Sequence, residues 1–503
     1  VTLNASMEWR KGSLEAVNGS LKGQDLLLPL GDYGTPVSIK SVEADVNLEQ
    51  KGKSWIMVLD NPYIGIAEKP WSAGRIRGSY AADESSLLIE KVKLADLHPV
   101  LDALSSDNKI VELVKSLYPS GDASDASLTL FGPINKPHDF LYKMAVSNGS
   151  VDAYKIYPSA TGLQANISIT RTGGSVIAEG RQSRLVLDRV YDHPLRVDDL
   201  QATVNWNKGE SSWHVDGRRL WLKNRDAEAV SSFVAEVPFD KSMAPRLQLK
   251  VDLINGNLSH ADHYYPVRLM KPGIKKWFEQ ANFRGRLNKA KLEYEGTAKG
   301  FPVAGADNFD VVANIEAGSM NFASGWPRLT GIDADLLISK NDLWIKGTAR
   351  DLYGQKVSDS TVHLSQLARA GKQVINVSTG LQGELGKVVE FLQQGPLFRQ
   401  SAISEISLAG KGHGAMQLDV SIPLADASGT RVKGEYKTSG ASLQLPDGSW
   451  LNSLQGKLDF TERSLSSSGL KGVMLGGPIA IKVNTLQAGQ PPIVELNANG
   501  EAH

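Results

Sequence analysis

The sequence predicts a mainly β protein in which many antiparallel strands are interrupted by a few short amphipathic helices. Three observations support this fold class: apolar and polar residues alternate along most of the chain, one strand pattern occurs four times, and one helix-to-strand junction occurs three times. Alternation with period two is typical of a strand with one dry and one wet face, whereas apolar residues three and four apart indicate a one-sided helix. Together the repeats predict one divergent repeat architecture.

Composition narrows the classes of function. The 503 residues contain 55 Lys and Arg, 55 Asp and Glu, and no cysteine. Balanced charge gives no overall attraction for nucleic acid, so we expect no nucleic-acid partner. Without cysteine there are no disulfides and no thiolate metal sites. No apolar run reaches the ~18 residues of a transmembrane helix, and because the sequence starts at Val1 we expect a mature form or an excised interior fragment.

The repeated strand pattern runs aliphatic, polar, small, polar, aliphatic. Its copies occupy residues 42–48, 200–206, 332–338 and 454–460, and a turn marked by proline or tryptophan precedes each: Thr35-Pro36, His193-Pro194, Trp326-Pro327 and Ser449-Trp450. A second strand follows each copy, at 55–59, 213–216, 343–347 and 465–470, so each predicts a hairpin. We also expect hairpin reversals at Asn18-Gly19 and Asn148-Gly149, because Asn-Gly favours tight turns.

The repeated junction is best preserved between Tyr264 and Gly296. After Pro272 an apolar stripe predicts a helix of about two turns, formed by Ile274, Trp277, Phe278 and Ala281. A strand ending at Gly296 follows it. Weaker copies have helices at 110–117 and 385–392, followed by strands at 128–132 and 406–410. We expect one continuous β fragment with approximate repeat units 1–132, 133–296, 297–410 and 411–503.

Strands with one apolar face must bury that face in some way. A closed sandwich, a closed barrel and a dry groove for an apolar ligand all satisfy this need. The alternation of residues alone does not choose among them.

Motifs that could bind a ligand or carry catalysis are sparse. Residues 410–414 look like a phosphate-binding loop, but a strand and not a helix follows them, so we expect a β-turn. His260-Ala261-Asp262-His263 lacks a third metal ligand and predicts a surface turn. No catalytic constellation, metal site or cofactor site is predicted. Eight basic residues and a single acidic one, Glu279, occur from Arg268 to Lys291. This excess of positive charge fits either a surface for anionic head groups or an ordinary solvated face.

The stretch from Tyr264 to Gly296, with Phe301-Pro302 and Trp326-Pro327 after it, resembles the YhdP branch of the bacterial AsmA-like proteins. The hairpin at 200, the strand 220–222 and the passage 237–262 stand in the order that this family shows, so the resemblance covers residues 160–350 and, by the repeats, the whole chain.

The resemblance implies a fold shared with bridge-like lipid transfer proteins: an elongated, twisted antiparallel sheet curled into a groove, described as a β-taco or an open jelly roll. It implies a non-catalytic periplasmic protein of a Gram-negative bacterium, anchored in the inner membrane, that carries phospholipid towards the outer membrane. The implied partners are phospholipids and both membranes. The resemblance does not identify further partners among the envelope proteins. The main alternative is a structural or adhesive β-sandwich repeat protein without lipid. The ten tryptophans also suggest a carbohydrate-active β-protein. The sequence does not show the paired carboxylates that such a protein would use in catalysis.

Under this resemblance the groove lining comes from the apolar phase of each strand. The expected lining residues are Val42, Ala44, Val46, Leu128, Leu130, Leu200, Ala202, Val204, Leu220, Leu222, Leu292, Tyr294, Ile332, Leu336, Ile338, Leu343, Ile345, Ile406, Leu408, Leu454, Leu458 and Phe460. The central helix, with Ile274, Trp277, Phe278 and Ala281, is expected to cover the groove. Head-group contacts are expected from Arg268, Lys271, Lys275, Lys276, Arg284 and Arg286.

Overall fold

A computed structural model of the chain describes residues 1–29, 34–66, 69–72, 74–105, 109–154, 158–270, 272–299, 306–324, 326–339, 341–367, 373–394, 409–426, 429–445, 447–487 and 493–500. These residues form 28 strands and a few short helices, so the predicted mainly β, antiparallel fold is confirmed. The chain divides into two compact units, one of residues 1–247 and 263–269 and the other of residues 248–262 and 270–503. Each unit is described by itself.

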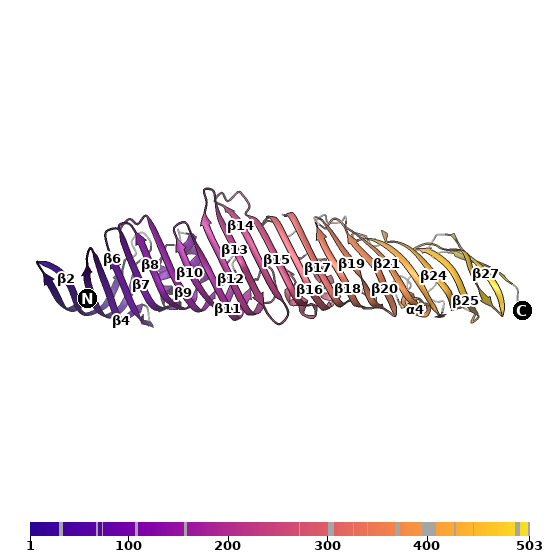
Figure 1. Ribbon diagram of the computed structural model, residues 1–503, viewed down its shortest axis with the longest axis horizontal. Helices are drawn as coiled ribbons and strands as arrows, with labels where there is room; N and C mark the ends of the chain where they lie inside the picture. The colour runs from indigo at the N-terminus through magenta and orange to yellow at the C-terminus, as the bar shows by residue number, and fades with distance from the viewer. Residues whose placement is uncertain are drawn as a thin grey trace. The chain divides into compact units, whose positions relative to one another are not determined.

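In the first unit, strands that follow one another in the chain are hydrogen-bonded neighbours, and Figure 1 shows them side by side in chain order. The exception is β4, whose two halves pair with the short β5 and with β6. The strands are β1 (Thr2–Arg10), β2 (Ser13–Leu28), β3 (Val37–Lys51), β4 (Ser54–Ile66), β5 (Lys69–Ser72), β6 (Arg75–Tyr80), β7 (Glu84–Lys93), β8 (Ser120–Phe131), β9 (Asp139–Val151), β10 (Ser159–Thr170), β11 (Gly173–Val186), β12 (Leu195–Lys208), β13 (Ser212–Lys223) and β14 (Glu228–Pro238).

The second unit repeats this plan. From β16 onward its strands pair in chain order, except that β21 pairs with β23 and β22 with β24. The remaining strands are β15 (Arg246–Asn257), which contains the boundary between the units, β16 (Arg284–Thr297), β17 (Ala306–Met320), β18 (Leu329–Ser339), β19 (Asp342–Leu352), β20 (Gln355–Leu364), β21 (Val374–Glu384), β22 (Ala409–Lys411), β23 (His413–Pro423), β24 (Arg431–Gln444), β25 (Trp450–Thr461), β26 (Leu465–Met474), β27 (Gly477–Gln487) and β28 (Ile493–Gly500).

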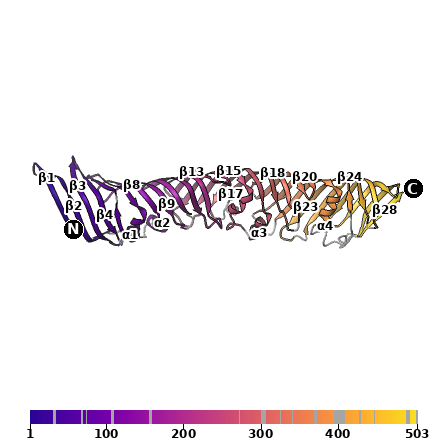
Figure 2. The same ribbon diagram turned by 90° about the horizontal axis from the view of Figure 1, so that it is seen from below.

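Each of the three predicted helices is present and leads into a strand. They are α2 (Lys109–Leu117) before β8, α3 (Pro272–Ala281) before β16 and α4 (Leu385–Gln394) before β22. Three further short elements were not predicted: the 3-10 helices η2 (Leu94–Leu97) and η3 (Leu258–Tyr264), and α1 (His98–Ala103). Figure 2 shows α1 and α2 along one side of the strands of the first unit. None of the helices within the described ranges has both the length and the hydropathy of a membrane span.

The four predicted hairpins are confirmed as the pairs β3–β4, β12–β13, β18–β19 and β25–β26. The two Asn-Gly reversals are wrong, because both motifs lie inside strands. Asn18 lies in β2, where its side-chain oxygen accepts a hydrogen bond from Asn47 at 2.5 Å. Gly19 lies against β1, where an added Cβ would be 2.1 Å from the carbonyl oxygen of Asn4. Asn148, with φ 51°, lies inside β9.

β-Bulges occur in many strands of both units. Non-glycine residues with positive φ lie inside strands close to shifts of register, including Asp125, Gln182, Arg219, Ala317 and Ser453. A bulge adds one residue to one strand of a pair, which bends the strand and increases its twist. Because of the extra residue, the side chains on the apolar face change from odd-numbered to even-numbered positions, or the reverse, on passing the bulge.

Three clusters of buried apolar side chains lie where helices meet the sheet and near the last strands. In the first unit, Trp71 and Val92 belong to a cluster that packs against η2 and α1. In the second unit, Val388 of α4 joins a cluster with Leu381 and Met416, and Ile481 belongs to another. Between these clusters the sheet has an apolar face whose side chains are mainly half-buried.

Candidate functional site

A continuous row of apolar residues crosses the first unit. The strand register places its thirteen members directly opposite one another from β1 to β14, with only β5 left out. Each is apolar or glycine, and nearly all are half-buried or exposed. The row consists of Met7, Val17, Leu48, Met57, Gly78, Leu87, Leu128, Tyr142, Ile169, Gly174, Trp206, Val215 and Ala235.

The residues beside this row in the chain form a second row on the opposite face. Ten of its thirteen members are polar, so the two faces of the sheet differ in chemistry over the whole row. This polar row consists of Ser6, Asn18, Asn47, Val58, Arg77, Leu88, Ser127, Lys143, Ser168, Ser175, Asn205, Asp216 and Val234.

The second unit has the same division. One row of eight apolar residues runs from β16 to β24: Ala290, Ala313, Leu336, Ile345, Val362, Val377, Val420 and Val432. The adjacent row on the opposite face is polar throughout: Lys289, Asn314, Asp335, Lys346, Thr361, Ser378, Asp419 and Lys433. We call the two faces of each unit the apolar face and the polar face.

Every predicted lining residue that the structure describes lies on the apolar face. Four of them, Ala44, Leu200, Tyr294 and Leu454, are buried, and the others are half-buried. Ile406 and Leu408 lie outside the described residues. Whether this face contacts lipid stays a prediction.

Pairs of an aromatic residue and a glycine shape the apolar face, and in three of them the two residues lie directly opposite each other. Each ring lies over a glycine on the neighbouring strand: Trp206 over Gly174, Phe233 over Gly217 and Phe460 over Gly434. An added Cβ at these glycines would lie 2.4, 2.2 and 2.1 Å from the ring, so the rings can rest on the sheet only because the side chain is missing. The rings therefore lie close to the backbone.

Two tyrosines on the apolar face report its low polarity. Burial raises the pKa of Tyr142 in β9 and the pKa of Tyr436 in β24. A phenolate loses more hydration than a phenol on leaving water, so burial favours the protonated hydroxyl. The Tyr436 hydroxyl is buried and has no hydrogen-bond partner among the described residues, whereas the Tyr142 hydroxyl donates to the sulfur of Met144 at 3.2 Å.

The predicted covering helix α3 buries only part of its apolar stripe. Ala281 is fully buried and Phe278 is half-buried, whereas Ile274 and Trp277 are 48% and 40% exposed. The ring of Trp277 lies 5.7 Å from that of Phe283, and its indole nitrogen donates to the carbonyl oxygen of Phe322 at 3.0 Å. The helix is thus fixed at its C-terminal end and presents apolar side chains to solvent near its start.

Two of the predicted head-group residues belong to ion pairs, and contact of any of the six with a head group stays a prediction. Arg268 pairs with Asp192 at 2.8 Å in the first unit, and Arg286 pairs with Glu316 in the second. Lys275 and Lys276 lie on α3, and Arg284 is exposed at the start of β16. Lys271 lies outside the described residues.

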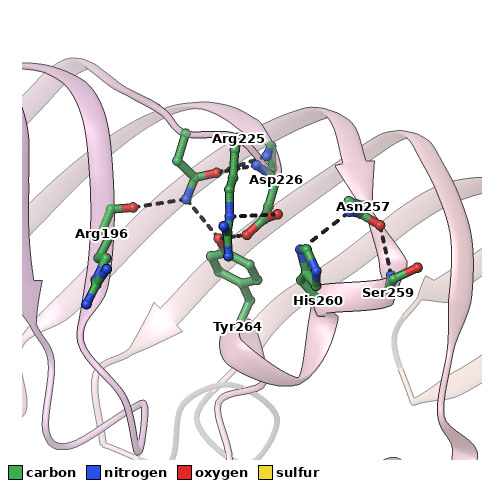
Figure 3. Close-up of polar contacts among 9 residues, drawn as sticks. Arg196, Arg225, Asp226, Asn257, Ser259, His260 and Tyr264 are labelled. Atoms are coloured by element: carbon green, nitrogen blue, oxygen red, sulfur yellow. Dashed lines mark hydrogen bonds and ion pairs between the residues drawn. The ribbon is translucent and has the colours of Figure 1, made fainter.

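The Tyr-Tyr-Pro stretch of the central junction is held by a polar network around the buried carboxylate of Asp226 in the first unit (Figure 3). The hydroxyl of Tyr264 donates to Asp226 at 2.8 Å and accepts from the side chain of Asn224 at 2.8 Å. Asp226 is only 4% exposed, and Arg225 lies 3.7 Å from its carboxylate. Burial and the bond to Asp226 raise the pKa of Tyr264 to about 12. The network ties residues 263–269 to the turn between β13 and β14.

The two motifs considered for metal and phosphate binding, residues 260–263 and 410–414, lie in a 3-10 helix and at a turn. Residues 258–264 form the 3-10 helix η3, at whose start the side-chain oxygen of Asn257 accepts from the backbone nitrogen of Ser259 (Figure 3). Gly412, with φ 85°, makes the turn between β22 and β23, as predicted. Within the ranges that the structure describes, no group of three or more His, Asp or Glu side chains could hold a metal ion.

Sequence reasoning missed the continuity of the apolar rows and the role of Arg328. Alternation within β9 would have identified Tyr142, but only the register places it between Leu128 and Ile169. Arg328 lies in the connection between β17 and β18, where its guanidinium donates to the carbonyl oxygen of Asn282 at 2.7 Å. No repeated pattern marked this residue.

Fold and surface together define a class of protein: antiparallel β-sheet proteins with one apolar, half-buried face and one polar face. Within this class, the chain belongs to the YhdP protein family, whose sequence profile matches residues 1–503. It is similar to the intermembrane phospholipid transporter YhdP of Escherichia coli K12, with 24% identity over 525 residues. That match covers 99% of this chain and 40% of the relative's length. No solved structure matches the chain.

Proposed function

We propose that the chain is a non-catalytic carrier of phospholipid in the periplasm, and that acyl chains move along the apolar face from the inner towards the outer membrane. The observation that carries the proposal is the strand register. It joins apolar residues into unbroken rows across thirteen strands of the first unit and eight of the second. The family relationship adds support, since the E. coli relative is described as an intermembrane phospholipid transporter.

The cost of exposing lipid to water explains why an unbroken row matters. Each methylene in water costs about 0.8 kcal/mol, so a tail of about sixteen carbons costs on the order of 13 kcal/mol. A tail that moves from Leu336 to Ile345 and on to Val362 stays against apolar side chains at every strand. Only the head group needs water, and the movement requires no nucleophile, cofactor or nucleotide.

The rival proposal is a structural or adhesive protein whose apolar faces touch only other protein. A string of closed sandwiches buries such faces between two sheets. In each unit the strands instead pair mainly with their neighbours in the chain, and the rows between the buried clusters are half-buried. Both features favour a face that is open to a ligand.

The test uses a photo-crosslinking residue on each face of one strand. Leu336 in β18 belongs to the apolar row, and its neighbour Asp335 belongs to the polar row. We expect a crosslinker at 336, and not at 335, to capture phospholipid when the protein is irradiated in bacterial cells. Lipid mass spectrometry of the purified protein should find bound phospholipid. Equal labelling at both positions, or a folded protein free of lipid, would refute the proposal.

A further inference from the structure

Strand β12 of the first unit carries a graded series of side chains on its apolar face. In the direction of the turn that joins β12 to β13, this face presents Leu200, Ala202, Val204, Trp206 and Lys208. Leu200 is buried, the next three are half-buried, and Lys208 is exposed. Because alternate residues of a strand share one face, the charge of Lys208 lies on the same face as the apolar row. Along one strand the face thus changes from aliphatic to aromatic to cationic.

Two aromatic rings and an exposed valine accompany Lys208 beside this turn. Trp213 of β13 lies directly opposite Lys208, and Val237 of β14 lies directly opposite Trp213. The ring centre of Phe239, just after β14, lies 6.3 Å from that of Trp213 and 5.8 Å from the ammonium of Lys208. Val237 and Phe239 are 37% and 40% exposed. We call Lys208, Trp213 and Phe239 the turn cluster.

The positive charge of Lys208 has no carboxylate partner among the described residues. Glu210 and Asp240 follow members of the turn cluster in sequence, but neither forms an ion pair with Lys208. Glu236 lies on the opposite face of β14, where it bonds to His214 at 2.6 Å. The ring of Phe239 is attractive to the ammonium but does not neutralise it. An uncompensated cation beside exposed apolar groups suits a ligand that is both anionic and apolar.

The order of these groups matches the order of groups in a phospholipid. In membrane proteins, tryptophan and lysine lie where hydrocarbon gives way to water, with the lysine ammonium on the wet side. The stretch from Leu200 to Lys208 spans about 26 Å at about 3.3 Å per residue. One leaflet contributes about 15 Å of hydrocarbon, half of a bilayer core. The face of β12 is therefore long enough for an acyl chain and the glycerol that follows it.

We infer that the turn cluster binds the phosphate and glycerol of a phospholipid whose acyl chains run along β12 towards Leu200. The ammonium of Lys208 donates charge-assisted hydrogen bonds to the phosphate oxygens, and the rings of Trp213 and Phe239 contact the glycerol. The inference rests on the proposed function, since the site and the acyl chains share the apolar face. It adds a claim that transport alone does not require, namely one fixed orientation of the lipid at this strand.

Two photoreactive lipids test this orientation on the whole 503-residue chain. Both are dioctanoylphosphatidylglycerols used below their micellar concentration. One carries a diazirine on the head group and the other carries it at the end of an acyl chain, and mass spectrometry locates the labels after irradiation. The head-group probe should label Trp213 and Phe239, whereas the acyl-chain probe should label Ala202 and Val204. The reverse pattern, or the same pattern with both probes, would overturn the orientation.

Substitution of Lys208 tests the phosphate contact. Lys208→Gln should lower labelling of the turn cluster by the head-group probe about tenfold, since a charge-assisted hydrogen bond contributes about that much. Lys208→Arg keeps the charge and should retain the labelling. The matched control is Lys143→Gln on the polar face, because Lys143 is also exposed and has no ion pair in the described part of the chain. Unchanged labelling in Lys208→Gln, or an equal loss in Lys143→Gln, would overturn the site.

Two further ligands separate the sources of the phosphate. Dioctanoylglycerol with the acyl-chain diazirine lacks the phosphate, so it should label the protein less and should be insensitive to Lys208→Gln. Inorganic phosphate should displace the head-group probe only at concentrations far above that of the probe. If phosphate displaces the probe at an equal concentration, the assignment to a lipid head group is overturned.

Phospholipid capture at Leu336, which lies in the second unit, decides the proposed function separately. If capture at Leu336 persists while Lys208→Gln is labelled normally, only the turn-cluster site is refuted. If capture at Leu336 fails while labelling of the turn cluster depends on Lys208, the site stands and transport along the apolar face is refuted.

Discussion

A carboxylate placed in the middle of the apolar row of the second unit is expected to remove lipid from the neighbouring strand. Ile345 lies directly between Leu336 and Val362 in that row. In Ile345→Asp the new carboxylate stays hydrated, so about four methylenes of an acyl chain beside it remain exposed to water. At about 0.8 kcal/mol each, the loss is roughly 3 kcal/mol, or about a hundredfold lower occupancy.

The assay is photo-crosslinking at Leu336 in the Ile345→Asp background, with captured phospholipid quantified by mass spectrometry. The control is Lys346→Asp, the next residue in β19, which lies between Asp335 and Thr361 on the polar face. It should leave capture at 336 within about twofold. Circular dichroism checks that both variants fold. Undiminished capture in Ile345→Asp, or an equal loss in both variants, would show that tails do not follow this row.

Three further predictions concern stability. Gly434→Ala should lower the free energy of unfolding by about 1–3 kcal/mol in urea, because its new methyl group would meet an aromatic ring. Gly469→Ala should not lower it, because no atom of the described residues lies within 4 Å of the added Cβ. Leu381→Ala should lower the free energy of unfolding by about 2–5 kcal/mol, whereas Gln382→Ala at the exposed neighbouring residue should leave it almost unchanged. Equal losses would contradict the assignment of faces. Tyr264, whose pKa is raised from 10.0 to about 12, contributes stability that is complete below pH 10 and is lost as the pH rises towards 12. The difference in unfolding free energy between wild type and Tyr264→Phe should therefore shrink over that interval, and a constant difference would contradict this account.

The elements that the sequence predicts correctly are those set by local patterns. The four hairpins and three helices follow from alternation, turn residues and apolar stripes, each of which lies within about fifteen residues of chain. The face of Leu336 or Val204 follows from the same alternation, because successive side chains of a strand point to opposite sides.

Features that depend on pairing between strands could not be predicted. Arg219 adopts φ 51° in β13, and nothing in an arginine indicates this left-handed conformation, which the neighbouring strands impose. The Asn-Gly prediction failed for the same reason, since Asn18 is held by a bond to Asn47 on the next strand. The bond from Arg328 to the carbonyl oxygen of Asn282 depends on how the β17–β18 connection folds back on the end of α3, which the separation of the two residues in sequence does not reveal.

The pairing of each strand with its neighbour in the chain makes the length of the sheet an adjustable quantity. Within either unit, one inserted hairpin would add two strands and extend the sheet by about 9.6 Å, since neighbouring strands lie about 4.8 Å apart. The insertion would break only one existing strand pair, and both flanking strands would keep their directions and their faces. A protein built in this way can be lengthened by duplicating short stretches of its gene. Its span could thus evolve to match the distance it must cover without redesign of the remaining strands.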